Sequence, residues 1–384
     1  MKYYISKDDT IIFSPEYNKM LNVNLISKYK KVIFSDYKLS KELFDNYNNN
    51  SFNNLILSDS SFNQPVNNFN VKKKYLKHFN ETINKLYGSV ENIHKNLTHL
   101  TFGNSFNQTV NHLPKSLTHL TFGYKFNQQV NELPVNLIHL IFGYKFNQTV
   151  KNLPVNLTHL TFGCEFNQQV NNLPVKLIHL TFDYYFNQQV NNLPKNLTHL
   201  TFGYHFNQPI NNLPVNLTHL TFGCEFNQQV NNLPVNLIHL TFSRCFNQPI
   251  NNLPVNLTHL TLGYYFNQPV DNLQYNIKYL HLNCSDKFVL DSLNDGIEEL
   301  VLGVYFCSEL LNLPISIRKI IFNENSKFDK ELNCLPKFTK LIQLPEKYNT
   351  KISNIPIGLK KIICSKDYLY ISDFISNNIC IETY

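Results

Sequence analysis

The sequence predicts a repeat solenoid that is mainly β-structure. Its strongest feature is a period of 20 residues, which indicates stacked coils. The chain also has 58 Asn and no Ala, so a poor helix former is abundant and the best one is absent. Its apolar content of 43% is enough to fill a core. The period is set by the triplet Phe-Asn-Gln, which starts at Phe106, Phe126, Phe146, Phe166, Phe186, Phe206, Phe226, Phe246 and Phe266.

Each repeat contains one short strand, and in one rung we expect it at about Thr118–Phe122. Leu120 and Phe122 are two residues apart, so both point into the core, whereas His119 and Thr121 point the opposite way. The six apolar positions of this rung are Leu117, Leu120, Phe122, Phe126, Val130 and Leu133.

The residues around the strand exclude a helix from the return path. Gly123 follows the strand, and we expect it to supply an unusual φ angle. Asp183 and Ser243 replace this Gly in two rungs. Pro134 follows Leu133 and lacks the N–H that a helix needs. We therefore expect extended or 3₁₀ return segments, with the strands of successive rungs forming one long parallel sheet on a concave face.

The regular rungs give the domain organisation. They span about residues 96–275, inside a repeat region of residues 51–365. We expect an N-terminal cap with degenerate rungs over residues 1–50 and a C-terminal cap over residues 366–384, because open stacks need caps. Degenerate copies bring the stack to roughly seventeen rungs from about residue 25 to about residue 365. These copies begin at or near Tyr29, Phe52, Phe62, Phe79, Ile277, Ile297, Ile317, Phe338 and Leu359.

One Asn per rung is predicted to form a structural ladder. Backbone groups buried in the turns of a solenoid need hydrogen-bond partners, and an amide side chain offers both donors and an acceptor. We interpret this column as structural, and the Gln column that starts at Gln108 in the same way. The Asn ladder is Asn107, Asn127, Asn147, Asn167, Asn187, Asn207, Asn227, Asn247 and Asn267.

A His column lies on the exposed face of the predicted sheet. Three interpretations remain open: a tolerated surface residue copied by duplication, a weak metal site, or a pH-responsive surface. A straight ladder offers ligands in a line, whereas metal sites need three or four convergent ligands, so we predict no metal. The column starts at His99 and continues with His119, His139, His159, His179, His199, His219, His239 and His259.

The two positions after the conserved Gly vary from rung to rung. They follow the strand, on the rim of the predicted sheet face, and Tyr and Arg are favoured anchors in recognition. We hypothesise that this strip sets partner choice, and drift at unconstrained surface sites is the alternative. The strip comprises Tyr124, Lys125, Tyr144, Lys145, Glu165, Tyr184, Tyr185, Tyr204, His205, Glu225, Arg244, Tyr264 and Tyr265.

Several function classes lack support in the sequence. No nucleotide-binding, zinc or hydrolase motif appears, so we predict no catalytic residues and no cofactor. The net charge is only +7, and the densest basic cluster is Lys72, Lys73, Lys74 and Lys77, so no nucleic-acid footprint is evident. No apolar run is long enough for a membrane span. The Cys pattern and the sequons in predicted strands favour an intracellular, cytoplasmic protein.

The repeat resembles a known family. The pattern F-N-Q-x-V/I followed by L-P-x-x-L-x-x-L-x-F-G over about residues 52–365 is similar to the FNIP repeat, which is related to leucine-rich repeats. The family occurs mainly in social amoebae and in giant viruses of amoebae, and a viral source would imply the host cytoplasm. The resemblance implies a leucine-rich-repeat-like coil. Many members carry an N-terminal F-box, and residues 1–50 lack its Leu-Pro start and helical spacing.

These observations favour a non-catalytic repeat scaffold that binds a protein partner. The family resemblance extends this role to a substrate-recognition or adaptor surface. The alternative is a metal- or pH-responsive binding module that uses the His column.

Overall fold

A computed structural model describes residues 98–384, apart from residues 105, 108, 111, 112, 272, 274, 275 and 285. Before residue 98 it describes the backbone of four strands. The chain divides into two compact units, Met1–Leu197 and Thr198–Tyr384. In each unit the described regular coils stack, and each contributes one short strand to a parallel sheet.

Unit 1 contains nine described strands. β1 and β2 pair antiparallel, and from β2 onward each strand pairs in parallel with the next one along the chain. The regular strands keep equivalent residues opposite one another, as in the pairing of His119 with His139. The strands are β1 (Tyr3–Ile5), β2 (Thr10–Phe13), β3 (Lys31–Phe34), β4 (Asn54–Leu57), β5 (His99–Thr101), β6 (His119–Thr121), β7 (His139–Ile141), β8 (His159–Thr161) and β9 (His179–Thr181).

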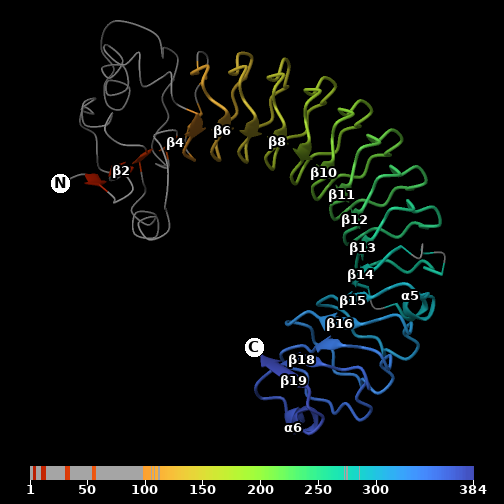
Figure 1. Cartoon of the computed structure of the whole chain (residues 1–384). Helices are drawn as coiled ribbons and strands as arrows, with labels where there is room; N and C mark the ends of the chain where they lie inside the picture. The colour runs from red at the N-terminus through yellow and green to blue at the C-terminus, as the bar shows by residue number, and fades with distance from the viewer. Residues whose placement is uncertain are drawn as a thin grey trace, which may run out of the picture. The chain divides into compact units, whose positions relative to one another are not determined.

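The described residues of unit 2 contain ten strands, and each strand pairs in parallel with the next one along the chain. Its two short helices, α5 (Lys287–Asp291) and α6 (Ile371–Ile375), lie on the side of the coils away from the strands (Figure 1). The strands are β10 (His199–Thr201), β11 (His219–Thr221), β12 (His239–Thr241), β13 (His259–Leu262), β14 (Tyr279–Leu282), β15 (Glu299–Leu302), β16 (Lys319–Phe322), β17 (Leu341–Gln343), β18 (Lys361–Cys364) and β19 (Cys380–Thr383).

The predicted inward-facing residues form the core. Leu120 and Phe122 are buried, as are Leu117 and Phe126 of the same coil. The two Phe rings of a coil stack at close range, with centroids 3.8 Å apart for Phe122 and Phe126. Leu262 replaces the first Phe in the coil of Phe266. A ring also lies parallel to its equivalent in the next coil of the same unit, 5.6 Å from Phe122 to Phe142. Two columns of Phe rings therefore fill the interior of the regular coils within each unit, and the predicted parallel β-solenoid is confirmed.

The return path consists of extended segments and two turns. The Phe126 N–H donates to the Gly123 carbonyl, and the Leu137 N–H donates to the Pro134 carbonyl. Hydrogen bonds between coils continue beyond the strand: the Ile138 N–H donates to the Thr118 carbonyl at 2.8 Å, and the Lys145 N–H donates to the Tyr124 carbonyl at 2.9 Å. Because the backbone pairs along so much of each coil, three-residue strands are sufficient.

The reason for the Gly after each strand differs from the expectation. Among the described residues Gly296 is the glycine with positive φ, so Gly143 does not supply an unusual backbone angle. A Cβ atom at Gly143 would lie 1.9 Å from the Gly123 carbonyl oxygen. Close approach of two coils therefore favours glycine at Gly143, although two other coils carry Asp183 and Ser243 at this position, and the predicted φ requirement is wrong.

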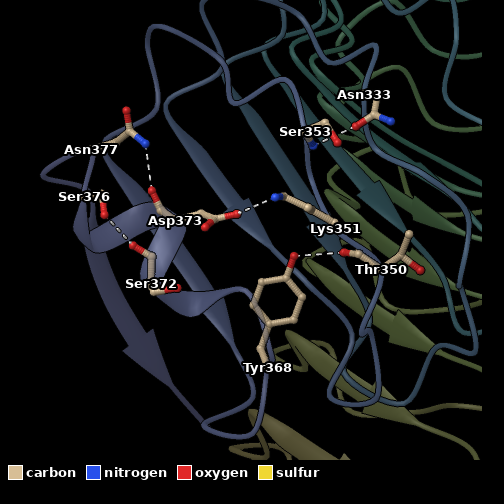
Figure 2. Close-up of polar contacts among 9 residues, drawn as sticks. All are labelled: Asn333, Thr350, Lys351, Ser353, Tyr368, Ser372, Asp373, Ser376 and Asn377. Carbon is tan, nitrogen blue, oxygen red and sulfur yellow. Dashed lines mark hydrogen bonds and ion pairs between the residues drawn. The ribbon is translucent and has the colours of Figure 1, made fainter.

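The C-terminal coils replace Phe by Tyr in one core column. Phe328 stacks on Tyr348 at 5.9 Å, and Tyr348 stacks on Tyr368 at 6.1 Å. The Tyr368 hydroxyl donates to the Thr350 carbonyl at 2.9 Å, and Lys351 pairs with Asp373 of α6 at 3.6 Å. Figure 2 shows both contacts. The buried phenols thus gain acceptors, and α6 is tied to the preceding coil by an ion pair.

One prediction about the N-terminal coils needs revision. The stack begins before residue 25, because β2 (Thr10–Phe13) already pairs in parallel with β3. β4 pairs directly with β5, with Asn54 opposite His99, so these two strands are neighbours in the sheet. The copies predicted at Phe62 and Phe79, the Lys72–Lys77 cluster and most of residues 1–50, where the F-box was considered, lie outside the described residues.

The predicted start of the coil at Phe338 is wrong by one residue. Phe338 is 45% exposed, whereas Thr339 is fully buried in the position that Leu117 holds in a regular coil. The Thr339 N–H donates to the Pro336 carbonyl, as Leu117 does to Pro114. The apolar residue was chosen from the pattern, but the spacing from Pro336 decides which side chain enters the core. The Thr339 hydroxyl has no hydrogen-bond partner.

We predict that Thr339→Val stabilises the protein by about 1–2 kcal/mol, because it removes a buried unsatisfied hydroxyl while keeping the side-chain shape. Thermal and urea unfolding of unit 2 would measure the change. Thr350→Val is a matched control, since the Thr350 hydroxyl donates to the Asp329 carbonyl, and it should not stabilise. A loss of stability in Thr339→Val would contradict this account of the site.

Candidate functional site

The Asn ladder connects successive coils through side-chain oxygens. The Asn147 Oδ1 atom accepts from the Asn167 backbone N–H at 3.0 Å and from the Gln168 Nε2 group at 3.0 Å. The same pair of bonds joins Asn127 to the coil of Asn147. One carbonyl oxygen therefore satisfies two donors of the next coil, and these Asn and Gln residues hold coils together.

The His column forms a stack of rings on the exposed face of the sheet. Ring centroids of neighbouring His residues lie 3.9 Å apart for His99 and His119 and 4.3 Å apart for His119 and His139, with nearly parallel planes. The Thr118 hydroxyl lies 2.9 Å from the His119 Nδ1 atom and donates to the Thr98 carbonyl. Because the Thr118 hydroxyl has one proton and donates it to Thr98, His119 Nδ1 must carry the proton that it shares with Thr118. In the neutral ring this leaves Nε2 unprotonated.

This geometry makes the His column poor at binding protons. Burial, together with His99, His139 and His159, lowers the pKa of His119 from 6.5 to about 4. Burial, together with His139 and His179, lowers the pKa of His159 to about 4. A charged ring would face other rings at about 4 Å, so His119 and His159 are neutral at pH 7.

The same geometry disfavours the metal-binding alternative. Rings stacked in parallel direct their nitrogen lone pairs along one direction and do not converge on a point, as a metal site requires. Among the residues that the structure describes, no group of three or more His, Cys, Asp or Glu side chains could hold a metal ion.

The predicted partner strip lies in the turn after each strand. In unit 1 the Tyr124 and Tyr144 rings stack with centroids 4.6 Å apart. The Lys145 ammonium lies 5.3 Å from the centroid of Tyr144 and pairs with Glu165 in the next coil. The structure thus brings Tyr124, Tyr144, Lys145 and Glu165 into one contiguous surface. Tyr184 and Tyr185 form an edge-to-face pair two coils after Tyr144, and Lys125 lies in the turn beside Tyr124.

In unit 2 the strip is centred on Arg244. Its guanidinium lies 5.9 Å from the ring centroid of Tyr264 and 5.4 Å from that of Tyr265, and it donates to the Tyr265 hydroxyl. Tyr305 extends the cluster, packing edge-to-face on Tyr264 at 5.3 Å. His205 pairs with Glu225 at 2.9 Å, and Tyr204 packs edge-to-face on His205. Tyr305 was not in the predicted strip because its coil is degenerate in sequence.

An exposed Val column is a surface that the sequence analysis did not identify. These residues follow the conserved Pro, and their side chains are half exposed or more, up to 70% for Val175. The signal was available, because Lys115 and Lys195 take the place of Val in two coils, and exchange of Val for Lys is typical of a surface site. The column comprises Val135, Val155, Val175, Val215, Val235 and Val255.

The repeat is similar to a known family and to solved structures. The FNIP repeat family matches residues 90–125, 109–145, 126–164, 166–205, 189–225, 206–245 and 246–285, together just over half of the chain. The chain belongs to the FNIP repeat family. No curated protein matches it. No helix among the described residues is long and apolar enough to cross a membrane.

Two solved structures resemble this FNIP repeat protein. The first is CroV588, described as a novel circular LRR protein, with a TM-score of 0.68 and 31% identity over 96% of this chain. The chain spans 58% of the length of CroV588. The second is YopM from Yersinia enterocolitica, with 20% identity, a TM-score of 0.41, and coverage of 83% of this chain and 68% of YopM. The likeness to CroV588 shows that the FNIP repeats here form a leucine-rich-repeat-like solenoid.

We predict that the His column makes the protein sensitive to acid. Its folded pKa values lie below the unfolded value of 6.5, so the unfolded chain binds more protons, and stability is lost as pH falls from about 6.5 toward 4. The midpoint of thermal unfolding, measured between pH 7 and 4, should fall less in a variant with His139, His159 and His179 all changed to Gln. Both proteins share the same carboxylates, so equal falls would contradict the prediction.

Proposed function

We propose that this FNIP repeat protein is a non-catalytic scaffold that binds a protein partner through the strip of residues after each strand. The observation that carries the proposal is the exposed Tyr and Arg cluster on the strip. Tyr264 and Tyr265 remain 41% and 49% exposed although Arg244 packs against both. Large aromatic side chains and Arg supply most of the binding energy in protein interfaces.

The fold does not require aromatic residues at these positions. The second residue after the strand donates its backbone N–H to a carbonyl of the preceding coil. The bond from Lys145 to Tyr124 is 2.9 Å long, and the bond from Glu165 to Tyr144 is 2.8 Å long. The bond from Cys245 to Cys224 is again 2.9 Å long. The same turn thus accepts Tyr, Cys, Lys or Glu, and the side chains are available for recognition.

The arrangement of the side chains supports preorganised binding. Tyr124 and Tyr144 hold each other by stacking, and Arg244 is held by Tyr265. Side chains that are already ordered lose less entropy when a partner binds. A partner surface with apolar pockets for Tyr and carboxylates for Arg244 and Lys145 would complement the strip. The family resemblance would make this surface a substrate-recognition or adaptor surface, and the bound protein its substrate or target.

The test uses one variant with Tyr184→Ala, Tyr185→Ala, Arg244→Ala and Tyr264→Ala. A partner is captured from the native cell with the wild-type chain, identified by mass spectrometry, purified and titrated by calorimetry. We expect the variant to bind at least about tenfold more weakly, since anchor residues each contribute about 1 kcal/mol or more. Its thermal midpoint should stay near the wild-type value because the replaced side chains are exposed.

The matched control replaces four residues of the Val column, with Val155→Ala, Val175→Ala, Val235→Ala and Val255→Ala. This control should bind like the wild type. Unchanged affinity in a folded strip variant would contradict the proposal. Loss of affinity in the Val variant alone would place the binding surface on the other edge of the coils.

A further inference from the structure

Two cysteines of unit 2 face each other across neighbouring coils. Cys224 lies in the turn after β11, and Cys245 lies in the turn after β12. The Cys245 N–H donates to the Cys224 carbonyl at 2.9 Å. The Cys224 side chain also lies near enough to Cys245 to raise the pKa of the Cys245 thiol. The two residues are one repeat plus one residue apart in the sequence, so stacking of the coils brings their side chains together.

The geometry fits a disulfide between coils. A backbone hydrogen bond between parallel segments keeps the two Cα atoms roughly 5–6 Å apart. Disulfides span Cα distances of about 4.4–6.8 Å, and the Cβ atoms must point toward each other. The influence of Cys224 on the pKa of Cys245 places the two side chains near each other.

The surroundings leave the pair accessible and distinguish its two thiols. Both Cys side chains are partly exposed, so a small oxidant can reach them. Burial, Cys224 and Glu225 raise the pKa of Cys245, and Arg244 opposes them. Cys245 is therefore the poorer first nucleophile, and we assign it as the resolving thiol.

Cys164 provides an internal comparison. It occupies the same position in its coil as Cys224, but the residue that donates to its carbonyl is Tyr185, at 2.9 Å. Cys164 is also buried, and it raises the pKa of Tyr144 in the preceding coil. Of these two equivalent cysteines, Cys224 has a thiol partner in the next coil.

We propose that Cys224 and Cys245 form a redox-sensitive site that a low-molecular-weight disulfide converts into a covalent link between the coils of β11 and β12. The Cys224 thiolate attacks one sulfur of the external disulfide, forming a mixed disulfide and expelling a thiolate. The Cys245 thiolate then attacks the Cys224 sulfur and expels the second thiolate. Two electrons pass to the external disulfide, and the two thiol protons leave with its halves or to solvent.

Peptide mapping tests the proposal directly. Trypsin cleaves after Lys195, Arg244 and Lys278, which places Cys224 and Cys245 alone on adjoining peptides, residues 196–244 and 245–278. The full-length chain, reduced and then treated with oxidised glutathione as a dilute monomer, is alkylated and digested without reductant. We expect the two peptides joined, with the loss of two hydrogens, and a higher thermal midpoint that returns to the starting value after reduction.

Two variants separate the outcomes. Cys245→Ser should lose the joined peptides and leave glutathione on Cys224, whereas Cys164→Ser should form the joined peptides in wild-type yield. The proposal is overturned if wild-type Cys224 carries only glutathione. It is also overturned if the link forms no more readily than links among the exposed Cys307, Cys334 and Cys380. The wild-type map alone decides between these results if a variant does not fold.

Discussion

The hydrogen bond from one coil's backbone to the Asn side chain of the preceding coil is the interaction on which the stack depends. A turn inside a solenoid leaves an N–H that no strand can pair. The Asn147 oxygen meets this need for Asn167 and also accepts from the Gln168 side chain. Because the acceptor belongs to one coil and the donors to the next, a coil is complete only when it is stacked. This requirement accounts for the fixed Phe-Asn-Gln triplet.

The same requirement distinguishes the residues that hold the coils together from the surface residues whose side chains can vary. Phe rings, Leu side chains and the Asn ladder fix the spacing between coils, and Gly143 allows the turns to approach. The positions after the strand keep their backbone hydrogen bonds whatever side chain they carry. Variation is therefore confined to surface columns, and both the Tyr–Arg strip and the Cys224–Cys245 pair lie in such a column.

The regular part of the fold could be predicted from the sequence because each contact repeats every 20 residues. The inward direction of Leu120 and Phe122 followed from strand alternation alone. The irregular coils could not be predicted in the same way. Phe338 looked like the core residue, but the turn at Pro336 places Thr339 there. The role of Gly143 depends on the distance to a neighbouring coil, which no single rung reveals.

The candidate surface was only partly predictable. The variable strip was visible as a break in the repeat, but its packing around Arg244 and the addition of Tyr305 depend on contacts between coils. The Cys pair required knowledge of the register, because partners 21 residues apart meet only when coils stack in parallel. The low pKa of His119 likewise depends on the ring spacing, not on the residue itself.

Native-state hydrogen exchange at the Asn167 amide in Asn147→Ala tests the central claim most directly. The variant removes the acceptor for that N–H, so we expect its opening free energy to fall by about 1–3 kcal/mol. Asn171→Ala is the control, since Asn171 is exposed and bonds only to nearby Gln169, and it should change the value by less than about 0.5 kcal/mol. Equal exchange of the Asn167 amide in the two variants would show that the Asn ladder does not hold the coils together.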